Sequence, residues 1–172
     1  MLTKNFYSYM RAALQKTSAT FTRLGGTTES VSIVVAQEKS PFAVMNEWSK
    51  NENYVGVAFG AGTIPATASD YALESILDNT KISATPPSAV TFSQGDAFDE
   101  YSVSFGVTNI ADETITISEV GLVAMPYKNP NTANSACIVL VDRTVLDTPV
   151  TIPPHETKHI AYTIRFNYGD IV

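Results

Sequence analysis

The chain has 172 residues, of which 44% are hydrophobic, and this length suits one domain with a core of its own. Its 17 acidic and 11 basic residues give a formal charge of −6, which disfavours nucleic acid as the main partner. The single cysteine, Cys137, excludes an intrachain disulfide, and no run of about 18 apolar residues predicts a membrane helix.

The N-terminus lacks the order of charged, apolar and small residues that marks a signal peptide. We therefore expect synthesis in the cytoplasm and no membrane partner. Only 16% of the residues are charged, below the roughly 25% usual in soluble domains. Such a surface tolerates contacts with other proteins. The alternative is that the low charge reflects only the β-rich fold, because β-rich domains often carry few charges.

Residues 2–15 have the spacing of an amphipathic helix, with apolar side chains three and four positions apart. The helix also holds more aromatic residues than one narrow stripe needs. It packs either on its own domain or on a neighbouring subunit, and we treat residues 1–16 as a helical arm and residues 17–172 as one β domain. The apolar stripe consists of Leu2, Phe6, Met10, Ala13 and Leu14.

From residue 17 onward, short β-branched and aromatic runs alternate with Gly, Pro, Asn and Asp. The clearest run is 160–168, where Ile160, Tyr162, Ile164, Phe166 and Tyr168 share one face. The pattern predicts a mainly β fold, an antiparallel β-sandwich of jelly-roll or immunoglobulin-like type with an N-terminal helix. The other predicted strands are 20–24, 31–36, 54–59, 90–93, 101–108, 114–125, 138–143 and 150–152.

Breaker residues predict the connections between these strands. Gly25 and Gly26 indicate a tight turn, and Pro153 with Pro154 indicates the tip of a hairpin. The segment 126–135, with two prolines and three asparagines, is predicted to be a polar loop. Loops of this kind often carry binding contacts.

The segment from His155 to His159 matches the H-E-x-x-H pattern of zinc metalloproteases. That motif needs a helix, which places both imidazoles on one face and lets the glutamate activate a water. Here two prolines precede the motif and an alternating strand follows it. We therefore interpret it as an exposed turn.

Three further features are weak signals for chemistry. Gly60-Ala61-Gly62 follows a strand but lacks the remaining glycine or Gly-Lys of a phosphate loop, so we interpret it as a turn. Asp96, Asp99 and Glu100 cluster in a predicted loop without the spacing of a calcium site. Cys137 precedes an apolar run and is interpreted as a small buried side chain. We expect neither a cofactor nor a metal.

Two stretches resemble segments of virion structural proteins of tailed bacteriophages. The first is Val57-Ala58-Phe59-Gly60-Ala61-Gly62-Thr63-Ile64-Pro65, followed by Asp70-Tyr71-Ala72-Leu73-Glu74. The second runs from Ile117-Ser118-Glu119-Val120-Gly121-Leu122 through Arg143-Thr144-Val145-Leu146 and Pro149-Val150-Thr151-Ile152 to Tyr162-Thr163-Ile164-Arg165-Phe166. The resemblance implies a β-rich capsid, neck or tail component without enzymatic activity.

The leading hypothesis is therefore a phage structural protein, made in the host bacterial cytoplasm, that assembles with itself and other virion proteins. The alternatives are a receptor- or carbohydrate-binding module with segment 126–135 at its tip and Trp48 as a stacking residue, and a zinc hydrolase using His155 and His159. The hypothetical interface consists of Leu2, Phe6, Tyr7, Tyr9, Met10, Tyr127, Asn129 and Asn131.

Overall fold

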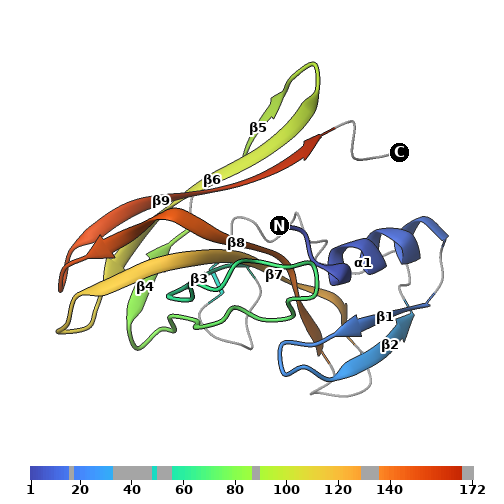
Figure 1. Cartoon of the computed structure of the whole chain (residues 1–172), viewed down its shortest axis with the longest axis horizontal. Coiled ribbons are helices and arrows are strands. Elements are labelled where there is room, and N and C mark those ends of the chain that lie inside the picture. The colour runs from blue at the N-terminus through green and yellow to red at the C-terminus, as the bar shows by residue number, and fades with distance from the viewer. Residues whose placement is uncertain (16–17, 33–47, 50–55, 87–89, 129–135, 168–172) are drawn as a thin grey trace.

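The computed structural model describes residues 1–15, 18–32, 48–49, 56–86, 90–128 and 136–167. These residues form a mainly β structure with antiparallel sheets and one N-terminal helix (Figure 1). No helix in the described ranges is long and apolar enough to span a membrane. The elements are α1 (Lys4–Gln15), β1 (Ser18–Thr22), β2 (Thr28–Ser32), β3 (Gly56–Gly60), β4 (Ile82–Thr85), β5 (Thr91–Gln94), β6 (Phe98–Asn109), β7 (Ile115–Lys128), β8 (Ala136–Ile152) and β9 (Thr157–Asn167).

One sheet has β7 at its centre, with β3 on one side and β8 on the other, and we call it the β7 sheet. The N-terminal residues extend it, because Thr3 donates its backbone N–H to the Val141 oxygen (3.0 Å) and Arg143 donates to the Met1 oxygen (3.0 Å). Leu24 donates to the Ile138 oxygen at 3.4 Å. The outer edge of β8 is thus covered from residue 138 to residue 143.

The other large sheet has β6 at its centre, and we call it the β6 sheet. The strand β9 pairs with β6 from Phe98 to Thr108 without a register shift. Since β9 occupies one edge of β6, β4 and β5 share the opposite edge. Figure 1 shows the far ends of β6 and β9, together with β5, extending beyond the rest of the described chain.

Side chains from both sheets form one hydrophobic core. Phe59 of β3 and Phe105 of β6 make an edge-to-face contact with ring centroids 5.6 Å apart, and both are fully buried. The predicted alternation in β9 is confirmed, because Ile160, Tyr162 and Ile164 are buried while their neighbours are exposed. Cross-strand packing of this kind, which removes apolar area from water, is the main stabilising contribution to such folds.

The opposite face of the β7 sheet carries a smaller apolar cluster, built on Ala58, Val123 and Leu140. Leu73 and Ile76, from the segment between β3 and β4, pack against this cluster. The long connection 61–81 therefore covers the second face of the β7 sheet, so this sheet is buried on both sides.

Three predicted connections differ from the structure: the turn between β8 and β9, the break between the two predicted parts of β8, and the loop after β7. The tips of β8 and β9 do not form a hairpin, because β8 pairs with β7 and β9 pairs with β6. The predicted hairpin turn at Pro153 is instead a crossover between the sheets, held by a hydrogen bond from the His155 N–H to the Asn109 oxygen (3.0 Å). The predicted strands 138–143 and 150–152 are two parts of β8, interrupted by an irregularity opposite Ser118.

The loop predicted at 126–135 begins later than expected. The strand β7 runs through Pro126 to Lys128, and Tyr127 pairs with Cys137 of β8. The pairing is irregular between Ala124 and Tyr127, which accommodates a proline that cannot donate to the ladder. Residues 129–135 lie outside the described residues.

The helix α1 lies against β1 and β8 of its own chain. Phe6 is buried in the core, and its ring centroid lies 5.9 Å from that of Phe166 in β9. The buried Asn5 side chain donates to the Thr22 oxygen (2.8 Å) and accepts from the Thr22 N–H (2.8 Å), so it pairs with β1 as a neighbouring strand would. The segment predicted to be an arm therefore contributes to the domain's own packing.

Candidate functional site

Glu119 of β7 is a fully buried carboxylate. One oxygen accepts from the Ser75 N–H (2.8 Å) and the Gly62 N–H (3.1 Å). The other accepts from the Glu74 N–H (3.2 Å) and from Nε of Arg143 (2.7 Å). A buried charge is tolerated only when it is paired and hydrogen-bonded, and this carboxylate meets both conditions.

Arg143 of β8 is the only guanidinium among the buried polar residues of the described chain. Besides Glu119, its side chain donates to Oδ2 of Asp70 (2.8 Å) and to the Ile64 backbone oxygen (3.0 Å). Its Nη2 also lies 3.6 Å from a carboxylate oxygen of Glu74. The planar guanidinium thus joins β7, β8 and two points of the segment 61–77.

Burial alone would raise the pKa of the Asp70 carboxyl group. Hydrogen bonds from Thr67 and Arg143, together with the Arg143 charge, outweigh this effect and hold the pKa below its usual value. Burial likewise opposes the charge of Arg143, but Asp70 and Glu119 raise its pKa. Asp70 and Arg143 are therefore both charged near neutral pH.

Two glycines allow the segment after β3 to approach Glu119. A Cβ at Gly60 would lie 2.5 Å from a Glu119 oxygen and 2.7 Å from the Ser75 oxygen. A Cβ at Gly62 would lie 2.4 Å from the Cβ of Glu74. No larger residue fits at either position without displacing the backbone. This segment therefore does bind a carboxylate, through the Gly62 N–H, but the carboxylate is the Glu119 side chain of the same chain.

Every charged group of this network is bound to another part of the same network. Glu74 accepts hydrogen bonds from the Thr63 N–H (2.7 Å) and the Ile64 N–H (2.8 Å), so it joins the end of the segment 61–77 to its beginning. Asp70, Glu74 and Arg143 line an open hollow on the surface, but their polar groups bind one another and the backbone of the segment, so the arrangement leaves none of them as an activated nucleophile. Its physical effect is to fix the connection 61–77 to the β7 sheet.

The predicted interface residues of the helix are divided between core and surface. Phe6 is buried, and Leu2 and Tyr9 are partly buried against the core. Tyr7 and Met10 are exposed, at 59% and 36%. For Tyr127 the structure gives only the strand pairing, and Asn129 and Asn131 lie outside the described residues.

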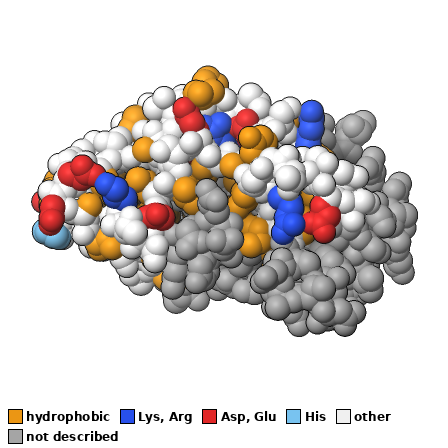
Figure 2. All heavy atoms as spheres, turned by 90° about the horizontal axis from the view of Figure 1, so that it is seen from below, with side chains coloured by type: hydrophobic (Ala, Val, Ile, Leu, Met, Phe, Trp, Pro, Cys, Tyr) orange, Lys and Arg blue, Asp and Glu red, His pale blue; other side chains and the backbone are white. Residues whose placement is uncertain are grey.

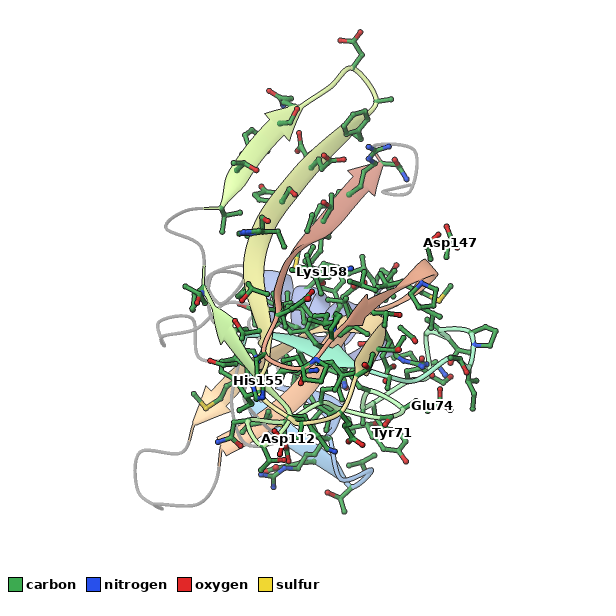
Figure 3. The ribbon with its side chains drawn as sticks, turned by 90° about the vertical axis from the view of Figure 1, so that its left-hand side faces the viewer. Tyr71, Glu74, Asp112, Asp147, His155 and Lys158 are labelled. Atoms are coloured by element: carbon green, nitrogen blue, oxygen red, sulfur yellow. The ribbon has the colours of Figure 1, made fainter. Side chains whose placement is uncertain are left out.

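The histidines of the H-E-x-x-H segment lie in two different kinds of structure. His155 is in the exposed crossover with a φ of 61°, and His159 is in strand β9. The helix that the zinc motif requires is therefore replaced by a turn and a strand. Figure 3 shows His155 beside Asp112, well away from Tyr71 and Glu74, and the His155 Nε2 lies 3.4 Å from the Asp112 carboxylate. Within the described ranges, no three His, Cys, Asp or Glu side chains are grouped to hold a metal.

The remaining candidates are also used structurally. Asp99 and Glu100 belong to β6 instead of the predicted loop, and Glu100 accepts a hydrogen bond from Nε of Arg165 at 2.9 Å. Cys137 is fully buried, and burial, followed by the charge of Glu29, raises the pKa of its thiol to about 11. A thiol with this pKa is not a nucleophile at neutral pH.

Sequence reasoning gave no role to Glu119 and Arg143, although both lie in the stretches that carry the phage resemblance. A signal was present: Glu119 lies within a predicted strand rich in apolar residues, and Arg143, next to Asp142, directly follows the apolar run 137–141. Charged residues at such positions are almost always paired. Their partners, however, come from a segment more than 40 residues away in sequence, and no local pattern reveals that contact.

Comparison with protein-family models, curated proteins and solved structures found no match for this chain.

Proposed function

We propose that this chain is a non-enzymatic structural protein of a tailed bacteriophage virion. It would fold as a β-sandwich and assemble with copies of itself and with other virion proteins on the capsid, neck or tail. The host bacterial cytoplasm would be the place of synthesis, and the virion the final location.

The observation that carries this proposal is the closed network around Arg143. The two stretches that resemble phage virion proteins are separate in sequence, and they meet at Glu119, Arg143, Asp70 and Glu74. In an enzyme, residues of this type leave a reactive group open to substrate. Here they hold a connection in place, which is the role expected in a building block.

The arrangement of the sheets supports the sandwich. Side chains of the β7 sheet and the β6 sheet share one core, and Phe59 meets Phe105 across it. A core shared in this way is expected of two sheets that pack face to face. The topology assigns neither the jelly-roll nor the immunoglobulin-like type.

The surface charges agree with protein partners better than with nucleic acid. Figure 2 shows, on the face that it draws, basic side chains that stand singly or beside acidic ones, instead of a basic patch. Tyr7 and Phe92 are exposed at 59% and 55%, and aromatic side chains of this kind often anchor protein interfaces.

Mass spectrometry of density-purified particles of the encoding phage tests the proposal. We expect the chain in intact particles at a fixed ratio to the major capsid protein, and antibody labelling at one position on the particle. A chain that is abundant in the lysate but absent from the particles would contradict it.

Neither alternative gains a supporting observation. Trp48 is half-buried against the core and its indole nitrogen is buried, so its ring is not presented as an open stacking surface for a sugar. A zinc hydrolase using His155 and His159 would need the helix that the crossover and β9 replace.

A further inference from the structure

Strand β9 is a long and regular edge strand. Its eleven residues pair with β6 without a bulge. Within the described ranges, no strand pairs with the other edge of β9. An edge of this kind presents backbone N–H and C=O groups to any chain that can align with it.

Proteins usually protect such edges with prolines, bulges, charges or a covering segment. The edge of β8 follows this rule, because Met1, Thr3 and Leu24 cover it. The middle of β9 does not, since residues 159–164 include no Lys, Arg, Asp, Glu or Pro. The side chains of His159, Ala161 and Thr163 are exposed there.

We infer that β9 pairs antiparallel with β9 of a second copy, so that two β6 sheets join into one. This inference rests on the assembly part of the proposed function. Identical strands can pair antiparallel about a two-fold axis, because the N–H and C=O groups of one edge then meet the C=O and N–H groups of the same edge in the second copy. Directly opposed residues in an antiparallel pair point to the same face, so the axis must pass through a residue position.

The register is chosen by comparing which side chains lie opposite each other, and the register with Thr163 on the axis avoids placing a charged side chain opposite a described residue of the apolar face. Thr163 then opposes its own copy, Ala161 opposes Arg165, and Tyr162 opposes Ile164. An axis through Tyr162 would place Lys158 opposite Phe166 in the apolar row and His159 opposite Arg165. An axis through Ala161 would place Lys158 opposite Ile164. With Thr163 on the axis, Lys158 opposes position 168, which lies outside the described residues, so of these three registers only this one places Lys158 opposite none of Ile160, Tyr162, Ile164 and Phe166.

The test uses opposite charges at the axis. Sedimentation velocity should show a wild-type dimer, whereas Thr163→Lys and Thr163→Asp should each be monomeric, because each places like charges face to face. An equimolar mixture of the two variants should dimerise again. Ser83→Lys, an exposed residue of β4 in the same sheet, adds the same charge and should leave the dimer intact.

A second measurement keeps the inference testable if a charged variant fails to fold. Thr163→Cys should form an intermolecular disulfide under mild oxidation, and Ser83→Cys should not. The native Cys137 can remain, since it is buried.

Two results would overturn the pairing: a wild-type monomer at every concentration, or a Thr163→Lys dimer as stable as the wild type. A monomer that is nevertheless found in phage particles overturns the β9 pairing alone. A Thr163-dependent dimer that is absent from particles overturns the proposed function and leaves the pairing.

Discussion

The two large sheets differ in how their surfaces are used. The β7 sheet is covered on both faces, by the core on one side and by the segment 61–77 on the other. The N-terminal residues also cover the edge of its outer strand β8. The β6 sheet extends beyond the rest of the described chain, with every side chain of β5 exposed (Figure 1).

This difference indicates that the β7 sheet mainly stabilises the fold, whereas the β6 sheet offers surface for contacts with other chains. The apolar run from Cys137 to Val141 in β8 would be a strong template for aggregation if its edge were open, so covering it protects the fold. The middle of β9 is flanked by exposed polar side chains and stays uncovered among the described residues. We interpret the β7 sheet as the scaffold and the β6 sheet as the surface for assembly.

Deletion of residues 1–16 should have the largest effect on this contrast. It removes the buried Phe6, the two hydrogen bonds between the Asn5 side chain and the Thr22 backbone of β1, and the N-terminal residues that cover the β8 edge. We expect loss of the cooperative thermal transition and aggregation, measured by calorimetry and light scattering. A truncated chain that stays soluble and melts as the wild type does would show that the helix is a separable arm.

Arg143→Ala should cost about 3–5 kcal/mol of unfolding free energy, because it leaves the carboxylate of Glu119 buried without its countercharge. Arg165→Ala is the matched control in the β6 sheet, since its exposed pair with Glu100 contributes only about 0–1 kcal/mol. Urea denaturation measures both. Equal losses would mean that the Arg143 network is not the anchor of the β7 sheet.

Within β9, adjacent residues should respond very differently. Ile164→Ala should cost about 2–5 kcal/mol because it opens a cavity in the core, where Ile164 is 5% exposed. Thr163→Ala, on the exposed face, should change stability by about 0.5 kcal/mol or less. Comparable losses in urea denaturation would contradict the facing of this strand.

The smallest effect concerns acid. The pKa of Asp70 is lower in the folded chain than in the unfolded one, so its stabilising contribution is present above the unfolded pKa and is lost as pH falls through the folded value. The stability difference between wild type and Asp70→Asn should therefore shrink below about pH 4. Urea titrations of both proteins across this pH range measure the difference, and a difference that stays constant down to about pH 3 would contradict the account.

The strands were predictable because their signal is local. Alternation in β6 and β9 appears within about ten residues, and the burial of Val103, Phe105 and Val107 follows it. The strand β4 was missed, since Ile82 and Ala84 are a short alternation beside two prolines. The crossover after β8 was misread because a proline turn does not reveal which strands pair on either side of it.

The site was predictable in composition but not in arrangement. The sequence contains Glu119 and Arg143 in strands, and the segment 61–77 carries Asp70 and Glu74. Their meeting depends on the segment folding back over the β7 sheet, where Leu73 and Ile76 pack. That contact is set by tertiary packing, which no periodicity encodes.

Hydrogen–deuterium exchange at several protein concentrations tests the contrast between the two edges most directly. Amides of residues 138–143 in β8 should be protected at every concentration, because the N-terminal segment covers that edge. Amides of residues 157–165 that point away from β6 should exchange rapidly in dilute protein and slow as the concentration rises and copies pair. Exchange in β9 that does not depend on concentration, or rapid exchange in β8, would contradict the assignment of scaffold and assembly surface.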